Sequence, residues 1–240
     1  MSLRAVATST LAIVDAGGYA APSGSWRALE PALTEAIAGT ELYTPDQLAR
    51  LVDRPGAGGP PPRIDVTAEA TGAAAARLAA SGPVALLAFA SAKNPGGGFL
   101  TGARAQEEDL ARCSALYACQ LTQPAYYAAN RATASMLYTD HLLHSPAVPF
   151  FRDDRLELLE HPYLASVITA PAPNAGEALR RDRAAGPDVA RTLWDVLDSS
   201  ALLLAAASWP VRHLESFARV READEAPLVI GHRGASGIDG

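Results

Sequence analysis

The sequence of 240 residues has little lysine, few aromatic residues and only two cysteines. Lys93 is the only lysine, the other basic residues are scattered arginines, and acidic residues outnumber basic ones by 26 to 20. This balance disfavours direct binding to DNA or RNA. Cys113 and Cys119 lie six positions apart, a spacing typical of neither a zinc site nor a redox pair. We therefore expect two buried, reduced thiols and no bound metal.

Long apolar stretches are also absent. The longest run, residues 201–207, is far shorter than the roughly 20 residues that a membrane span requires, and the N-terminus has no pattern of a secretory signal. These features predict a cytoplasmic protein that does not enter the membrane. With 49% hydrophobic and 19% charged residues, the chain has the composition of one globular domain.

The N-terminal quarter has short helical patterns separated by glycine and proline. Proline at a first helical turn and glycine at a helix end mark the boundaries of three helices, which we place at residues 4–15, 31–38 and 45–52. Residues 54–62 are almost all Pro, Gly and Ala, which indicates an exposed loop. The sequence therefore predicts a helical extension over residues 1–62 packed on a core over residues 63–240.

The rest of the chain alternates between strand and helix patterns. Residues 84–90 are continuously apolar, which is typical of a buried central strand. The other predicted elements are strands at 64–66, 164–170 and 228–231, and helices at 69–80, 106–121 and, broken around Gly186, 177–207; residues 122–155 are rich in proline. This order predicts an α/β fold with a mixed sheet between helices.

A glycine run and an acidic pair follow the predicted central strand. Gly96, Gly97 and Gly98 allow the backbone to adopt left-handed angles and to approach a diphosphate without any Cβ in the way. A flexible loop is the alternative for a glycine triplet alone. Ligand sites of open α/β sheets lie at such strand ends, so the position favours a binding loop.

Glu107 and Glu108 occupy the first turn of the next predicted helix. Taken alone, they could simply stabilise the helix end by about 0.3 to 1 kcal/mol. Adjacent helical side chains diverge by about 100°, so the two carboxylates cannot act as a symmetric pair. One could act on the reacting centre while the other holds a neighbouring hydroxyl.

The three glycines, the seven residues after them and the sequence Gln106-Glu107-Glu108 resemble the signature of bacterial-type poly(ADP-ribose) glycohydrolases. Further similar segments lie at residues 19–24, 42–45, 137–141, 145–146 and 168–174, so the resemblance covers residues 4–176. It implies a macrodomain-like three-layer α/β/α sandwich with a mixed central sheet and an N-terminal helical extension.

The resemblance also implies a function. The chain would hydrolyse ribose–ribose O-glycosidic bonds in poly(ADP-ribose), acting from chain ends and releasing ADP-ribose, with the polymer or ADP-ribosylated proteins as substrate and no cofactor or metal. Two alternatives stay open: a macrodomain that binds ADP-ribose without turnover, and a hydrolase of mono-ADP-ribosyl groups.

The same resemblance implies roles for individual residues. Glu108 would be the catalytic acid/base, and Glu107 would position the ribose hydroxyls. Asn94 would contact the terminal ribose and Gln106 would brace the acidic pair. The remaining ligand-binding residues implied by the motif are Gly96, Gly97, Gly98 and Phe99.

The C-terminus departs from the family pattern. Residues 227–240 contain a strand and a Gly-rich turn but lack the phenylalanine that closes over the diphosphate in bacterial relatives. The core could therefore be incomplete or remodelled after about residue 176. Residues 232–237 also resemble the opening motif of glycerophosphodiester phosphodiesterases, but that activity requires a complete barrel of at least roughly 200 residues.

Other polar residues have structural explanations. His141 and His144 could hold a metal from one helix, yet a structural role is favoured. Asp153 and Asp154 indicate a solvated turn. Ser114 has no nucleophile-elbow sequence. Tyr126 and Tyr127 could flank an adenine, but they fit buried packing better.

Overall fold

The computed structural model describes residues 1–52, 65–134, 138–173, 202–206 and 228–232. The chain divides into two compact units, residues 1–134 with 138–172, and residues 135–137 with 173–240. In the second unit, β7 (Leu202–Ala206) and β8 (Leu228–His232) pair in parallel. The strand predicted at 228–231 is therefore confirmed, whereas the helix predicted through residue 207 is wrong for residues 202–206.

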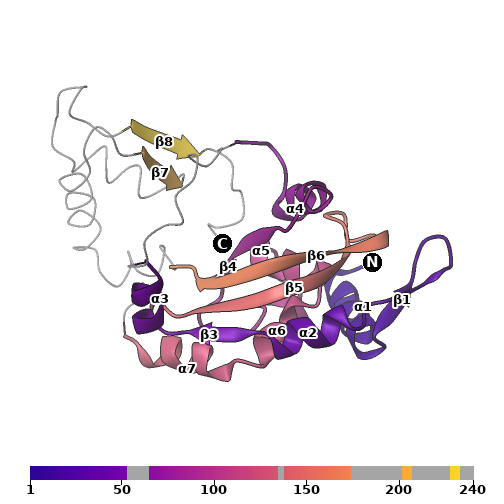
Figure 1. The fold of residues 1–240 in the computed structure, drawn as a ribbon, viewed down its shortest axis with the longest axis horizontal. Coiled ribbons are helices and arrows are strands. Elements are labelled where there is room, and N and C mark those ends of the chain that lie inside the picture. The colour runs from indigo at the N-terminus through magenta and orange to yellow at the C-terminus, as the bar shows by residue number, and fades with distance from the viewer. Residues whose placement is uncertain (53–64, 135–137, 174–201, 207–227, 233–240) are drawn as a thin grey trace. The chain divides into compact units, whose positions relative to one another are not determined.

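The first unit contains a mixed α/β fold (Figure 1). Its strands are β1 (Gly18–Ala20), β2 (Trp26–Ala28), β3 (Glu41–Tyr43), β4 (Ala85–Ala90), β5 (Leu142–Arg152) and β6 (Leu158–Pro171). Its helices are α1 (Leu3–Asp15), α2 (Ala32–Ala38), α3 (Pro45–Val52), α4 (Thr71–Ala79), η1 (Phe99–Thr101), α5 (Gln106–Cys113), α6 (Leu116–Leu121) and α7 (Pro124–Ala132). The predicted fold class, with helices packed on a mixed sheet, is confirmed.

The sheet has the order β3-β5-β6-β4. β4 pairs in parallel with β6, and the other pairs are antiparallel. One face of β4 is buried through Leu86, Ala88 and Ala90, but Leu87 and Phe89 are 46% and 59% exposed. The expectation of a central strand buried on both faces is therefore wrong within the described residues, where β4 is an edge strand covered on one face.

The N-terminal elements belong to the same unit as the sheet. Helix α1 is capped by Ser2, whose hydroxyl accepts from the Ala5 N–H, and it buries Val6, Ala7, Thr10 and Ile13. The Thr10 hydroxyl donates to the Arg112 carbonyl at 2.7 Å, which ties α1 to α5. The three N-terminal helices form where the sequence predicts them, whereas the boundary at residue 62 lies outside the described residues and stays a prediction.

Three further expectations need correction. The described residues of the strand predicted at 64–66 have no regular structure, and Val66 is exposed. The helix predicted over 106–121 breaks at Ser114, where the backbone is extended and bridges to Phe150. The proline-rich stretch 122–155 contains α7 and β5. Pro124 begins α7, and Pro146 lies at a register shift in β5, so neither proline interrupts a regular ladder.

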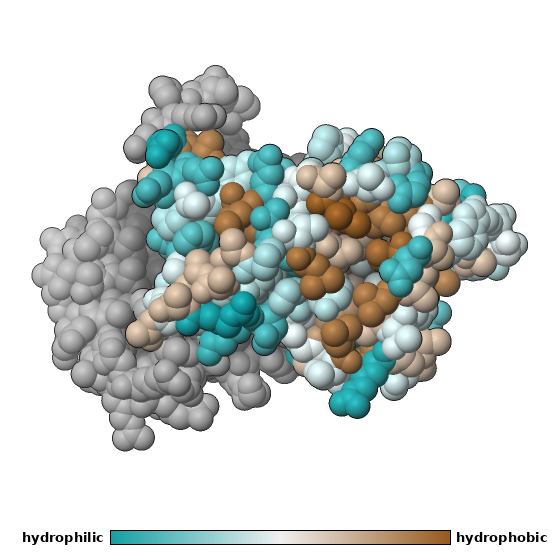
Figure 2. All heavy atoms as spheres, turned by 90° about the horizontal axis from the view of Figure 1, so that it is seen from below, coloured by the Kyte–Doolittle hydropathy of each residue, from teal (hydrophilic) through white to brown (hydrophobic). Residues whose placement is uncertain are grey.

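The core and surface follow the usual division of side chains. The main core cluster joins α2, α5 and α6 to β5 and β6, with Phe150, Phe151 and Leu116 fully buried. Seen from below, hydrophobic side chains gather towards the right of the view with hydrophilic ones interspersed (Figure 2). None of the described helices is long and apolar enough to cross a membrane.

Candidate active site

The loop from β4 to α5 brings the glycine run against the start of α5. Gly96 and Gly97 have positive φ angles of +62° and +54°, as the sequence predicts for this run. Their backbone N–H groups are used within the protein: the Gly96 N–H donates to the Gln120 side chain and the Gly97 N–H to the Asn94 carbonyl. The run therefore folds into tight turns that need glycine.

Glu107 is almost completely buried, with 2% of its surface exposed. Its Oε2 accepts from the Ser91 N–H at 2.7 Å, and its Oε1 accepts from the Gln120 amide at 2.9 Å. Burial raises the pKa of Glu107 to about 7, although the Ser91 N–H and the Gln120 amide oppose this shift. The side chain can therefore exchange a proton near neutral pH.

Glu108, the next residue of α5, is also buried, with 8% of its surface exposed. Its Oε1 accepts from the Gly98 N–H at 2.8 Å. This hydrogen bond links the glycine run directly to the first turn of α5. Glu107 and Glu108 therefore have different hydrogen-bond partners, and their separate roles stay a prediction.

Both carboxylates converge on Gly97. A methyl group on Gly97 would lie 2.5 Å from Glu108 Oε1 and 3.0 Å from Glu107 Oε2. The first contact is shorter than real Cβ contacts and the second is tighter than most of them, so both carboxylates would have to shift. The glycine is therefore required here by packing as well as by its φ angle.

Gln106 joins α5 to the end of β4. Its Oε1 accepts from the Phe89 N–H at 2.8 Å, and its Nε2 donates to the Leu87 carbonyl at 3.0 Å and to the Thr71 hydroxyl at 3.1 Å. The amide thus pairs with the edge strand as a backbone peptide would. These bonds fix the start of α5, and with it Glu107 and Glu108, beside the C-terminal part of β4.

The other two predicted ligand-binding residues differ in exposure. Asn94 is exposed in the loop, and its N–H donates to the Ser91 hydroxyl. Phe99 is fully buried, and its ring centroid lies 5.0 Å from that of Tyr117. The structure therefore places Asn94 at the exposed surface of the β4–α5 loop and the Phe99 ring in the core.

Gln120 on α6 is a member of the site that the sequence did not indicate. It is fully buried. Its Oε1 accepts from the Gly96 N–H at 2.8 Å, while its Nε2 donates to Glu107 and to the Thr169 hydroxyl, the latter at 3.3 Å. No local pattern distinguishes it from other polar residues on a short helix, so only the tertiary structure reveals it.

The remaining sequence candidates have structural roles. Asp153 accepts from two backbone N–H groups in the turn between β5 and β6, as expected. His141 bonds to Thr139, and His144 lies in a strand rather than on a helix. Tyr126 and Tyr127 are buried in an edge-to-face pair. The Ser114 hydroxyl donates to the Leu110 carbonyl.

Both cysteines are free and buried, as predicted. Burial raises the pKa of Cys113 to about 12 and that of Cys119 to about 11. Within the described residues, no cluster of three His, Cys, Asp or Glu side chains could hold a metal ion. The C-terminal loop expected to lack the phenylalanine clamp lies outside the described residues apart from β8.

Comparison with known proteins identifies relatives. The family model "Microbial-type PARG, catalytic domain" matches residues 7–153. The X-ray structure of poly(ADP-ribose) glycohydrolase from Thermomonospora curvata is 36% identical, with a TM-score of 0.71, and the match covers 98% of this chain and 94% of that one. The same enzyme bound to the inhibitor ADP-HPD matches with a TM-score of 0.69 at equal identity and coverage.

A second organism provides another relative. The crystal structure of poly(ADP-ribose) glycohydrolase from Deinococcus radiodurans in complex with ADP-ribose is 39% identical, with a TM-score of 0.60, over 84% of this chain and 90% of that one. No protein with curated annotation matches the chain significantly. The Thermomonospora match extends beyond residues 4–176, the range over which the sequence motifs carry the resemblance.

Proposed function

The chain belongs to the microbial-type poly(ADP-ribose) glycohydrolase family, and on this premise we propose that it cleaves ribose–ribose bonds with Glu108 as general acid/base. The convergence of Glu107, Glu108 and the backbone of Gly97 carries the proposal. Two carboxylates beside one glycine, each held by different partners, suit glycosidic cleavage, which needs one proton donor and firm placement of the sugar.

In the proposed reaction, Glu108 donates its proton to the oxygen of the leaving ribose as the C–O bond breaks. The positive charge that develops on the other ribose has oxocarbenium character. A water molecule then attacks this carbon, and Glu108 takes up the proton that the water releases.

We propose that Glu107 accepts hydrogen bonds from the ribose hydroxyls. Its two oxygens are fixed by Ser91 and Gln120, so a hydroxyl that reaches it meets an acceptor of defined direction. Since the pKa of Glu107 is raised to about 7 by burial, an arriving hydroxyl donor would favour the ionised form. Such a bond orients the reacting ribose without taking part in the proton transfer.

The loop would hold the remaining parts of the ligand. We propose that Gly96, Gly97 and Gly98 lie against the diphosphate and ribose, because without side chains they permit close approach. Asn94, which is exposed at the loop's start, would contact the terminal ribose. Gln106 would brace the acidic pair, and Phe99 would contribute by anchoring the loop in the core.

The test is a time course with purified protein and poly(ADP-ribose), in which free ADP-ribose is measured by chromatography. Replacement of a general acid typically costs about 10² to 10⁴-fold in rate. Glu108→Gln should therefore lower kcat by that amount while the Kd for ADP-ribose stays within about tenfold, since the residue acts on the transition state. A parallel loss of binding would contradict the assignment.

The same time course separates the alternatives. Release of ADP-ribose without intermediate oligomers supports the exo action that we propose. A protein that binds ADP-ribose but releases none from polymer would be a reader module. Activity on mono-ADP-ribosylated protein alone would indicate the mono-ADP-ribosyl hydrolase. ADP-ribosylated proteins as partners and a cytoplasmic location, which suits two free buried cysteines, complete the proposal.

A further inference from the structure

Gln120 connects the two halves of the candidate site. Its amide oxygen is bonded to the Gly96 N–H at 2.8 Å, and its amide nitrogen is bonded to Glu107 Oε1 at 2.9 Å. The side chain comes from α6, which lies outside both the glycine run and α5. One planar amide therefore spans the gap between the loop and the acidic helix.

The amide is itself held in place. Gln120 is fully buried, and its nitrogen also donates to the Thr169 hydroxyl at 3.3 Å on β6. An amide has oxygen and nitrogen on opposite sides, so a rotation by half a turn would set its N–H₂ group against the Gly96 N–H, which can only donate. This fixes which atom faces Glu107.

Gln120 also completes the restraint on Glu107. The Ser91 N–H holds Oε2 from the strand end, while Gln120 holds Oε1 from α6. Without Gln120, only one of the two carboxylate oxygens would keep a partner among these bonds. The carboxylate plane would then be free to turn about its remaining bond.

We propose, on the basis of the proposed function, that Gln120 is a positioning residue. It holds the Glu107 carboxylate and the Gly96 turn in a fixed position relative to each other during catalysis. It does not touch the reacting atoms and acts through these two neighbours. Misplacement of a reacting group by about 1 Å can cost roughly 10²-fold in rate. The role therefore predicts a loss in kcat that exceeds the loss in ligand affinity.

The titratable neighbours of Glu107 define what a pH measurement can detect. Glu108 lies beside it on α5, and the phenols of Tyr126 and Tyr127 interact with it from α7. Burial raises the pKa of both tyrosines above their ordinary value. They therefore stay neutral over the range in which a carboxyl pair titrates.

The decisive variant is Gln120→Glu. At low pH a protonated Glu at this position donates to Glu107 and still accepts from the Gly96 N–H, so it imitates the amide. As the pH rises, the pair loses its shared proton and the two carboxylates repel each other. The kcat of the variant relative to wild type should fall at least tenfold between pH 5.5 and 8.5.

Two further variants accompany it. Gln120→Met keeps the length of the side chain but loses its hydrogen bonds to Gly96, Glu107 and Thr169. It should lower kcat by about 10 to 100-fold while the Kd for ADP-ribose changes by less than about tenfold. Gln123→Glu is the matched control, because Gln123 donates to the Thr40 carbonyl and not to the acidic pair. Its kcat relative to wild type should be independent of pH.

The outcomes separate this role from the proposed function. A wild type that releases no ADP-ribose from polymer would overturn the proposed function and the positioning role together. An active wild type with a pH-independent Gln120→Glu ratio would overturn the positioning role alone. If Gln120→Glu does not fold, as judged by circular dichroism, Gln120→Met decides: equal losses in kcat and affinity contradict the proposal, and a selective loss in kcat supports it.

Discussion

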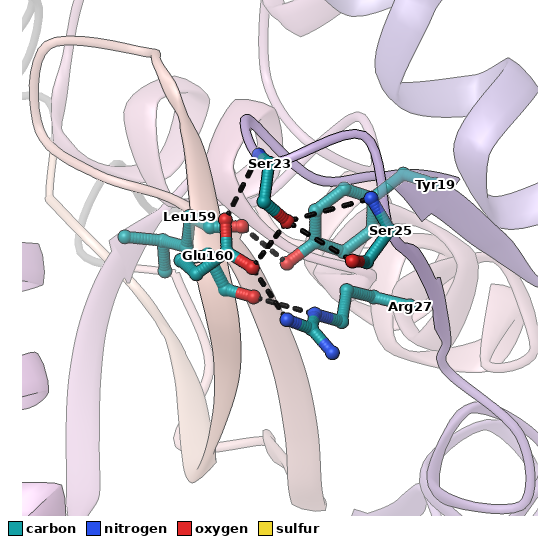
Figure 3. Close-up of polar contacts among 6 residues, drawn as sticks. All are labelled: Tyr19, Ser23, Ser25, Arg27, Leu159 and Glu160. Carbon is teal, nitrogen blue, oxygen red and sulfur yellow. Dashed lines mark hydrogen bonds and ion pairs between the residues drawn. The ribbon is translucent and has the colours of Figure 1, made fainter.

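Glu107 and Glu160 both accept hydrogen bonds from a backbone N–H and from side chains, but their pKa values are shifted in opposite directions. Glu107 accepts from a backbone N–H and a side-chain amide inside the site. Glu160, on β6, accepts from the Ser23 N–H and hydroxyl and pairs with Arg27, so that it clamps the β1–β2 hairpin (Figure 3). The pKa of Glu107 is raised to about 7, whereas that of Glu160 is lowered to about 2.

Solvent and a cation explain the difference. The side chain of Glu160 is 39% exposed, and its hydrogen bonds from Ser23 and its contact with Arg27 favour the charged form with little desolvation. Glu107 is buried without a cationic partner among the groups that shift its pKa, so desolvation outweighs its hydrogen bonds. The number of hydrogen bonds alone therefore does not tell whether a carboxylate is a clamp or a reactive group.

The largest expected effect concerns stability and Glu107. A folded-state pKa raised from 4.5 to about 7 contributes stability that is complete below about pH 4.5 and is lost as the pH rises through 7, an effect of about 3 kcal/mol. In Glu107→Gln the side chain cannot ionise, so this loss of stability with rising pH is abolished. The unfolding free energy of the variant, relative to wild type, should therefore rise by about that amount between pH 4 and 8.

Urea denaturation followed by circular dichroism at several pH values provides the measurement. Glu160→Gln serves as the control over pH 5 to 8, because the lowered pKa of Glu160 confines its effect on stability to below about pH 4.5. A constant difference between Glu107→Gln and wild type across the whole range would show that Glu107 is not perturbed by burial.

The next effect compares two glycines with positive φ, one in each region. Gly97→Ala would push a methyl group against both site carboxylates, and we expect kcat/KM to fall about 100-fold, since displacement of a reacting group by about 1 Å costs that much. At Gly24, in the hairpin, φ is +84° but a methyl group meets nothing within 4 Å. Gly24→Ala should cost only about 1 kcal/mol of backbone strain.

Turnover on poly(ADP-ribose) and thermal unfolding of both variants test this pair. Gly24→Ala should keep its kcat/KM within about twofold of wild type, which corresponds to less than 1 kcal/mol. Similar turnover in the two alanine variants would show that the space around Gly97 is not critical to the site.

The smallest effect concerns the exposed clamp. Because the folded-state pKa of Glu160 is lowered, its contribution to stability is present above about pH 4.5 and is lost as the pH falls towards 2. Glu160→Gln should therefore make acid unfolding less steep below pH 4.5 and leave turnover at neutral pH unchanged. Salt weakens exposed ion pairs, so 1 M NaCl should reduce the difference between variant and wild type.

Local sequence signals predicted much of the first unit. Helices α1, α3 and α4, strand β4 and the start of α5 lie within a few residues of their expected positions. Each is marked by its own periodicity, by a helix-terminal glycine or by an initial proline. The motif of Gly96–Gly98 and Gln106–Glu108 likewise holds in space, because the glycine run contacts both Glu107 and Glu108.

Elements that depend on distant partners were missed or misjudged. Strand β5 contains two prolines and exists because β3 and β6 pair with it on either side. Ser114 interrupts a continuous helical pattern because its backbone pairs with Phe150. Val66 alternates with Asp65 in a short strand-like pattern, but among the described residues it lies in no strand.

The sequence by itself determined which chemical groups are available: three glycines that permit tight turns, and two adjacent carboxylates at a helix start. The tertiary structure decided their properties, because burial and hydrogen bonds from Ser91 and Gln120 depend on which segments surround Glu107. Desolvation is a property of that surrounding volume, and residues 13 to 16 positions away define it here.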